Sequence, residues 1–272
     1  MDINTFPVIT DDVPPPGTTA GDAARLEYIG EVLALCGDVK RLWVPKSSDG
    51  TTSTDASRNA ATLTHAATIA GRMSQLGSGL AVSFDGVADY SSYPDAADLT
   101  HGDSSTDEAF TVVTLLNPTA LSGNQEICSK FDTSTGATQK EWRTFCSGAS
   151  FFANSQDDSA GARIGRSSSS NLSNATWALM TSVYDGSGVA AGWATYKQGT
   201  QWDTTDDTSG TYVAMENKTS VVYIGASKGA AAMTNYFSGK VAMNLIMKGR
   251  LNTDQMWTLT ALTNGFFGLT LS

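Results

Sequence analysis

The chain has 272 residues and a formal net charge of −10 at neutral pH. This negative surplus would repel a polyanion, so nucleic acid is not an expected partner. Apolar runs stay far below the roughly 18 residues of a membrane-spanning helix, so we expect no membrane contact. Only 16% of the residues are charged, and the abundance of Ser, Thr and Gly is typical of strands joined by many turns.

The first 39 residues predict an arm followed by a helix. Proline fixes the backbone and removes N–H donors, so residues 1 to about 20 predict an extended arm without a core of its own. Such an arm either frays or lies along a neighbouring subunit, and both alternatives stay open. The arm residues expected to serve assembly are Phe6, Pro14, Pro15 and Pro16.

An amphipathic helix of roughly four turns follows the arm. Thr19-Ala20-Gly21-Asp22 has the form of a capping box, and Gly37 ends the run. Leu26, Ile29 and Leu33 recur at helical spacing and complete the set of predicted anchoring residues. Their apolar stripe is expected to cover the flank of the following domain or the same helix in a partner. Docking on the chain's own domain is the simpler of these two alternatives.

From about residue 40 onward the pattern is one of strands and turns. Leu80, Val82 and Phe84 alternate with small residues, which predicts a half-buried strand. The dipeptide Asp85-Gly86 predicts a tight turn, and a second short strand with Tyr90 and Tyr93 follows it.

Two further local patterns lie in the second half of the chain. Residues 192–203 predict a hairpin that turns at Gln198-Gly199, with Trp193 and Thr195 on one face and Tyr196 on the other. Near the end, Asn252 or Thr253 is expected to cap a short helix. The apolar tail, residues 265–271, is expected to be held in a sheet or an interface.

Six segments between about residues 40 and 259 resemble, in matching order, the strands of laminin G-like domains. They are Asp49–Ser57, Leu80–Tyr90, Phe110–Pro118, Ile127–Asp132, Trp177–Gly186, and the pair Val222–Gly225 with Tyr236–Val241. Such domains belong to the concanavalin A-like lectin/glucanase, or jelly-roll, superfamily. The resemblance implies an all-β fold: an antiparallel β-sandwich over residues 40–272, preceded by the arm and one short helix of residues 1–39.

Glycoside hydrolases of this superfamily use two carboxylates, often as Glu-x-Asp-x-x-Glu on one strand. The chain contains no such segment, and neither a nucleophile elbow nor a phosphate loop. Its isolated glutamates in the sandwich, Glu126, Glu141 and Glu216, are interpreted as solvated turn residues. We therefore expect no enzymatic activity, and a glycoside hydrolase ranks last among the hypotheses.

Calcium is the metal that the resemblance suggests, with Asp85 and Asp89 as oxygen donors. The family often has an acid where this chain has Ala242, and this departure argues against the site. No cofactor is expected beyond this weak calcium candidate.

The three cysteines leave two alternatives open. Cys128 and Cys146 could form one disulfide, or these two and Cys36 are reduced buried thiols, which we favour. Zinc is not expected, because the chain has no paired cysteine motif and its only histidines, His65 and His101, are far apart.

A carbohydrate site would need aromatic side chains beside hydrogen-bonding groups. The candidates are Trp193, Tyr196, Trp202 and Asp203. The alternative, which we favour, is that Trp193 fills the sandwich core and Trp202 packs on its flank.

The leading hypothesis is a non-enzymatic structural or decoration protein on the capsid or tail exterior of a bacteriophage particle. It rests on the proline arm, the lack of a catalytic pair and the lack of a signal-peptide pattern after Met1. Such a protein would be made in the host cytoplasm and would form homo-oligomers. It would contact other virion proteins through its arm and cell-surface glycans through the sandwich. The alternative is a free-standing, carbohydrate-binding lectin-like module.

Overall fold

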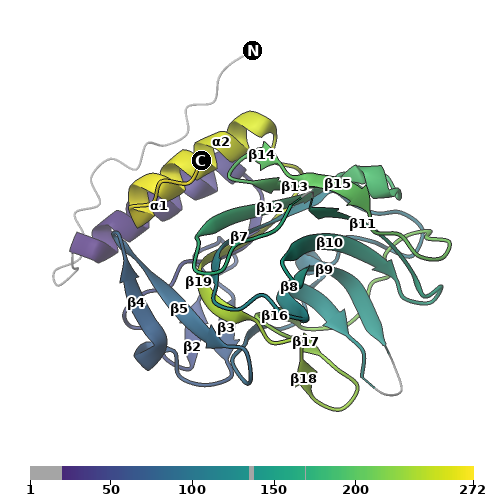
Figure 1. Cartoon of the computed structure of the whole chain (residues 1–272), viewed down its shortest axis with the longest axis horizontal. Coiled ribbons are helices and arrows are strands. Elements are labelled where there is room, and N and C mark those ends of the chain that lie inside the picture. Colours follow the sequence, from purple (N-terminus) through teal and green to yellow (C-terminus); the bar gives the residue numbers. More distant parts are fainter. Residues whose placement is uncertain (1–19, 135–137, 169) are drawn as a thin grey trace.

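The computed structural model describes residues 20–134, 138–168 and 170–272. Two β-sheets face each other, and two helices cover the outer face of the first sheet (Figure 1). All strand pairs are antiparallel except one short parallel contact between β17 and β8. The predicted all-β sandwich is therefore confirmed, with a helical layer added to it.

The first sheet has eight strands in the order β14-β13-β12-β7-β19-β5-β4, with β1 also paired to β19. Their bounds are β1 (Val39–Trp43), β4 (Met73–Leu76), β5 (Gly79–Asp85), β7 (Phe110–Pro118), β12 (Ala178–Tyr184), β13 (Trp193–Lys197), β14 (Thr200–Gln201) and β19 (Ser238–Lys248).

The second sheet has eleven strands, nine of them in the order β15-β11-β10-β9-β8-β16-β6-β3-β2. Their bounds are β2 (Thr52–Thr54), β3 (Thr62–His65), β6 (Ser91–Tyr93), β8 (Asn124–Asp132), β9 (Gln139–Ser147), β10 (Ser150–Asp157), β11 (Ala162–Ser168), β15 (Asp203–Asp206), β16 (Val222–Ile224), β17 (Ser227–Lys228) and β18 (Met233–Thr234). Single 3₁₀ turns cover Ala70–Arg72, Ala97–Leu99 and Ala190–Gly192.

The sandwich core lies between the two sheets, and a second core lies between the first sheet and the helices. Strand β7 contributes side chains to both cores. Val112 and Leu116 belong to the sandwich core, whereas Val113 and Leu115 belong to the core beneath the helices. A strand buried on both faces has a continuous apolar sequence, which explains why β7 lacks the alternation seen in strands with one solvated face.

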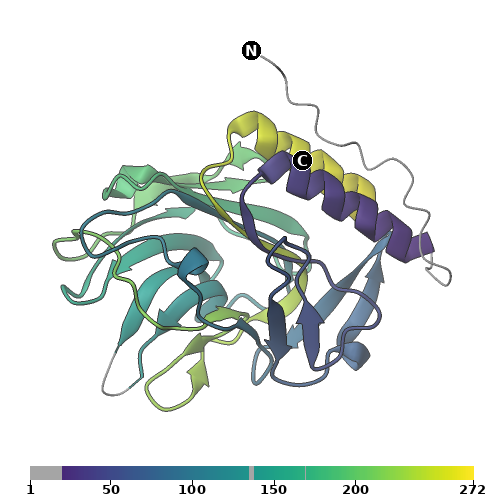
Figure 2. The same ribbon diagram turned by 180° about the vertical axis from the view of Figure 1, so that it is seen from behind.

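Helix α1 (Ala20–Cys36) packs on its own domain, against helix α2 (Thr253–Phe267). The ring of Tyr28 stacks on Phe266 at 4.5 Å between centroids, and the Tyr28 hydroxyl lies 3.1 Å from Thr263 Oγ1. Figures 1 and 2 show the two helices side by side from opposite directions. The helix was expected to pack either on its own domain or on the same helix of a partner, and the structure shows the first of these.

The predicted anchoring residues have different environments. Ile29 is buried and Leu33 is half-buried, so the core of the chain itself already uses them. Leu26 remains 53% exposed. Phe6, Pro14, Pro15 and Pro16 lie outside the described residues, as does Thr19 of the predicted capping box.

The predicted C-terminal helix is confirmed and is longer than expected. Asn252 caps it, accepting a hydrogen bond from the Gln255 N–H, while the Gln255 side chain accepts one from the Asn252 N–H. The helix ends at Gly268, whose φ of 61° suits glycine. Beyond it, the Asn264 side chain bonds the backbone of Leu271, which holds the apolar tail in place.

The predicted strand over residues 80–84 and its turn are also present, as β5 and the Asp85-Gly86 turn. The next strand, β6, does not pair with β5; it lies in the opposite sheet. The turn therefore carries the chain from one sheet to the other at the end of the sandwich.

All three cysteines are free and buried, as the favoured alternative had it. Cys128 and Cys146 lie on neighbouring strands but out of register, since Cys128 faces Thr144 and Cys146 faces Gln125. Among the described residues, no helix combines the length and apolar character needed to cross a membrane.

Candidate functional site

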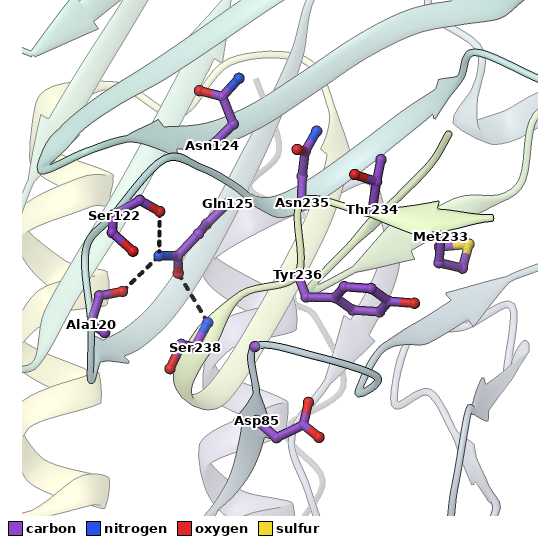
Figure 3. Close-up of a pocket in the computed structure, with 11 residues that line it drawn as sticks. Asp85, Ala120, Ser122, Asn124, Gln125, Met233, Thr234, Asn235, Tyr236 and Ser238 are labelled. Carbon is purple, nitrogen blue, oxygen red and sulfur yellow. Dashed lines mark hydrogen bonds between the residues drawn. The ribbon is translucent and has the colours of Figure 1, made fainter. Parts of the chain in front are cut away.

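A hollow of about 450 Å³ lies at one end of the sandwich, where three connections meet (Figure 3). The β5–β6 turn contributes Asp85 and Gly86, and the β7–β8 loop and the start of β8 contribute residues 120–125. The segment from β18 into β19 contributes residues 233–238. Exposed Ser122, Asn124 and Thr234 line it together with Tyr236, so its wall is rich in hydroxyl and amide groups.

The Asp85-Gly86 turn forms one wall by folding tightly on itself. Asp85 Oδ1 accepts hydrogen bonds from the backbone N–H groups of Val87, Ala88 and Asp89, at 2.8 to 3.0 Å. Gly86 has a φ of 76°, and a Cβ there would lie 2.9 Å from Ser238 Cβ. Only glycine allows both this backbone conformation and this close contact with β19.

Gln125 fixes the opposite wall. Its amide nitrogen donates to the carbonyls of Ala120 and Ser122, at 2.6 and 3.2 Å, and its amide oxygen accepts from the Ser238 N–H at 2.9 Å (Figure 3). The side chain is 4% exposed. A buried amide with its partners in place holds the β7–β8 loop against the first residues of β19.

Asn235 lines the hollow and connects it to a buried ion pair. It has a φ of 53°, and its carbonyl accepts the backbone N–H of Glu126 at 2.8 Å. Glu126 is fully buried and pairs with Arg143, whose Nη1 lies 3.2 Å from Glu126 Oε1. Burial raises the pKa of Glu126 to about 7, although Arg143 and Asn235 oppose this rise.

Tyr236 supplies the aromatic surface of the hollow. Desolvation, and then the charges of Tyr90 and Asp85, raise the pKa of its hydroxyl, so it remains a neutral donor and acceptor. Tyr90 in turn contacts Tyr223 edge to face, at 6.0 Å between centroids. An aromatic face beside amides and hydroxyls can stack on a sugar ring and bond its hydroxyl groups.

The four carbohydrate candidates chosen from the sequence do not form a common site. Trp193 is 1% exposed and lies in the sandwich core, stacked on Tyr184 at 4.9 Å between centroids, so it is not available to a ligand. Tyr196 lies on the other face of the same hairpin, half-buried against the second core. The predicted hairpin and its faces are thus confirmed, and the same alternation separates the two rings.

Asp203 begins β15, the edge strand of the second sheet, which three strands separate from β8, and Trp202 directly precedes it. Asp203 is 7% exposed, and its carboxylate accepts from the Thr195 N–H at 2.7 Å and from Arg166 Nε at 2.8 Å. Trp202 is half-buried, with its indole N–H bonded to Ser170. Asp203 is therefore a structural carboxylate, and Trp202 packs on the flank as the favoured alternative had it.

The calcium candidates are occupied by their own loop. Asp89 Oδ2 accepts the Asp85 N–H at 3.1 Å, and Asp89 Oδ1 pairs with Arg72. Among the described residues, no group of three or more His, Cys, Asp or Glu side chains is arranged to hold a metal ion.

The prediction that all three isolated glutamates are solvated turn residues is wrong for two of them. Glu126 and Glu141 lie within β8 and β9 and are fully buried. Each is held there by a cation from a neighbouring strand, Arg143 for Glu126 and Lys130 for Glu141. Glu216 does lie in a loop, where it pairs with Lys218.

Sequence reasoning missed the residues that line the hollow. Asn124, Gln125 and Tyr236 lie in or beside segments already matched to strands, but they belong to connections far apart in the chain. The one sequence signal that points to this region is the Asp85-Gly86 turn, because it lies at the end of the sandwich where these segments meet.

No protein-family model matches the chain, and no curated protein matches it either. Similar solved structures share its fold at low identity. A mutant of Trypanosoma rangeli sialidase displaying trans-sialidase activity has a TM-score of 0.56 at 13% identity over 92% of this chain. The binding domain of botulinum neurotoxin DC in complex with SialylT has a TM-score of 0.57 at 11% identity over 84%.

A third structure is domain 4 of AbnA, a GH43 extracellular arabinanase from Geobacillus stearothermophilus, in complex with arabinotriose. It has a TM-score of 0.55 at 14% identity, over 82% of this chain and 98% of that domain. The chain spans only 40% of the sialidase and 52% of the toxin chain. These likenesses show a shared β-sandwich fold.

Proposed function

We propose that this protein is a non-enzymatic, carbohydrate-binding lectin-like module and that it binds neutral glycans in the hollow at the sandwich end. The single observation that carries the proposal is the convergence of Tyr236, Asn124 and Thr234 on one open hollow framed by buried hydrogen bonds. Within the described residues, the Asn124 and Thr234 side chains make no hydrogen bond, so both remain available to a ligand.

The charge of the lining selects the class of glycan. Among the described residues that line the hollow, Asp85 is the only one with a carboxylate side chain, and none is a lysine or arginine. A sugar carboxylate or phosphate would meet a negative charge without a compensating cation, so an uncharged glycan is favoured. A single carboxylate also falls short of the pair that glycoside hydrolysis ordinarily needs, which supports binding without cleavage.

The comparisons add indirect support. Two similar domains are seen with sugars in their own structures, one with SialylT and one with arabinotriose. At 11% and 14% identity, these two structures support a shared fold and do not identify the ligand of this chain. The proposal therefore rests on the hollow itself.

The test is a screen on a glycan array followed by calorimetry with the best neutral ligand. We expect Tyr236→Ala to weaken binding about tenfold or more, because it removes the stacking surface. Trp202→Ala is the matched control: it removes an aromatic side chain next to β15, which three strands separate from β8, and affinity should not change. Loss of binding in the Trp202 variant alone, or no glycan binding at all, would refute the assignment.

The second candidate is a component of a bacteriophage particle, built on a laminin G-like sandwich. The observation that favours it is that Leu26 and Trp257 remain 53% and 47% exposed on the helical layer, which gives that layer apolar contacts for a partner. Strand β5 begins beneath Phe267 and ends at Asp85, so the helical layer and the hollow are separated by its length, roughly 20 Å. Attachment through the helices would leave the hollow facing outward.

Density-gradient fractions of the native source, examined by mass spectrometry, test the particle proposal. Stoichiometric amounts of the intact chain in the particle fraction are expected. A chain found only in the soluble fraction would overturn this candidate and leave the glycan proposal standing. Deleting residues 1–39 would be a poor test, since it removes α1 and with it part of the second core.

A further inference from the structure

Lys130 is a fully buried lysine on β8, with an exposed fraction of 0%. Its direct neighbour across the strand pair is Trp142, which is also fully buried and donates its indole N–H to the carbonyl of Leu99. Burying an ammonium costs several kcal/mol, so the structure must compensate the charge locally.

Four oxygen atoms surround the amine. Nζ lies 3.0 Å from Asp95 Oδ1, 2.8 Å from Thr100 Oγ1 and 2.9 Å from the carbonyl of Lys218, and it is in direct contact with Glu141 Oε1. Two carboxylates therefore meet one amine. They differ in burial, because the side chain of Glu141 is 0% exposed and that of Asp95 is 33% exposed.

One carboxylate oxygen of Glu141 is free to accept a proton. Its Oε1 accepts the Lys218 N–H at 2.9 Å as well as the amine, whereas its Oε2 is buried and has no hydrogen-bond partner within the described residues. Burial raises the pKa of Glu141 to about 7, although Lys130 opposes this rise. A carboxylate of this kind can accept a proton near neutral pH.

The surroundings have the character of a low-dielectric site. His101 is 1% exposed and lies 6.2 Å from Trp142 between ring centroids. Burial and the positive charge of Lys130 lower the pKa of this imidazole to about 3, so it stays neutral. In such surroundings, transfer of a proton from the ammonium to Glu141 replaces two buried charges with two neutral groups.

We propose that Lys130 and Asp95 condense into an intramolecular amide bond, with Glu141 carrying the proton. Glu141 takes one proton from the Lys130 ammonium and passes it to the Asp95 carboxylate, and the neutral amine then attacks Cγ of Asp95. As the C–N bond forms, Glu141 takes a second proton from the nitrogen, and as the C–OH bond breaks it delivers this proton to the departing hydroxyl, which leaves as water. One ammonium and one carboxylate give one amide and one water, with no oxidant or other reactant.

The geometry supplies what this reaction needs. The Lys130 amine lies 3.0 Å from Asp95 Oδ1 within one folded chain, and intramolecular reactions of well-oriented groups reach effective concentrations of about 10⁵ M or more. The partial exposure of Asp95 gives the released water a path to solvent. The resulting bond would tie the segment after β6 to β8, within the second sheet.

Intact-mass measurement of the purified full chain tests the proposal directly. We expect a mass lower than the sequence value by one water. Trypsin should then fail to cut after Lys130 and yield fragment 73–140 in place of 73–130. Cleavage after glutamate should leave fragments 32–108 and 127–141 joined. An unmodified mass with normal cleavage after Lys130 overturns the proposal.

Three variants identify the participants. Asp95→Asn should give the same amide with loss of one ammonia in place of one water, and Asp95→Ala should keep the full sequence mass. Glu141→Gln should stay uncondensed while retaining the circular dichroism spectrum of the folded protein. If Glu141→Gln condenses as fast as the parent chain, Glu141 is not the proton carrier. Because Asp95 is partly exposed, its two variants should fold even if a Lys130 variant does not.

Discussion

Two buried glutamates on neighbouring strands, each paired with a cation, behave as different chemical units. Glu126 meets Arg143 on the outer face of the second sheet, where the guanidinium lies 4.5 Å and 4.0 Å from the ring centroids of Phe131 and Phe145. Glu141 meets Lys130 near the other end of β8 from the hollow, where Asp95 and the backbone of Lys218 also contact the pair.

The difference between the two pairs lies in the cation. A guanidinium does not lose its proton in a protein, and its planar face suits stacking between aromatic rings. An amine that loses its proton becomes a nucleophile. The Arg143 pair is therefore permanent and structural, whereas the Lys130 pair has the parts of a reactive site.

The largest effect is expected for Lys130→Met in the Asp95→Ala background, where the Lys130 amine stays free, because the change leaves Glu141 buried without a cation. We expect a loss of about 3–5 kcal/mol in the free energy of unfolding relative to Asp95→Ala, measured by urea titration. Adding Glu141→Gln should recover part of this loss, because no unpaired buried charge remains. If Lys130→Met leaves the stability of the Asp95→Ala protein unchanged, Glu141 needs no cation.

The next effect concerns the pH dependence of stability. The pKa of Glu126 is about 7 in the folded chain and about 4.5 without the fold, so the native state holds the extra proton between these values. Stability from this group is present below about pH 4.5 and is lost as the pH rises through about 7, at up to about 1.4 kcal/mol per pH unit.

Glu126→Gln should remove that slope. His65 and His101, whose pKa values burial lowers to about 4 and about 3, act in the opposite direction. Their contributions cancel when the variant and the parent chain are compared at each pH. Parallel stability curves for the two proteins between pH 4.5 and 7 would contradict the assignment.

The smallest effect is expected for Arg143→Lys. The charge is kept, but the planar contact with Phe131 and Phe145 is lost, so we expect a loss of about 1–2 kcal/mol. Thermal unfolding monitored by circular dichroism is sufficient to measure it. An increase in stability would mean that the two rings do not hold the guanidinium.

Features with a local signal were predictable from the sequence. The Gln198-Gly199 hairpin, the Asn252 cap and the strand before Asp85 each follow from residues within a few positions of one another. The buried glutamates were not predictable in this way, because their partners come from another strand. Glu126 and Glu141 look like surface residues until Arg143 and Lys130 are placed beside them.

The prediction of the carbohydrate site was wrong for a related reason, because it also depends on contacts between distant parts of the chain. An aromatic residue on a strand carries no sign of which face it occupies relative to solvent, so Trp193 could be a platform or a core residue. The hollow around Tyr236 needs three connections to meet, and their meeting is a property of the sheet order. The strand pattern predicted an antiparallel sandwich, but it did not predict which strands are neighbours.

The pairing of α1 with α2 also sets the order in which the molecule can be completed. Tyr28 and Phe266 stack although more than 200 positions separate them, and the Gln255 side chain bonds the carbonyl of Leu35. During synthesis, the outer apolar face of the first sheet therefore stays uncovered until the second helix has been made. Contacts of such long sequence separation form late and leave intermediates prone to aggregation. We therefore expect the helical layer to close late in folding.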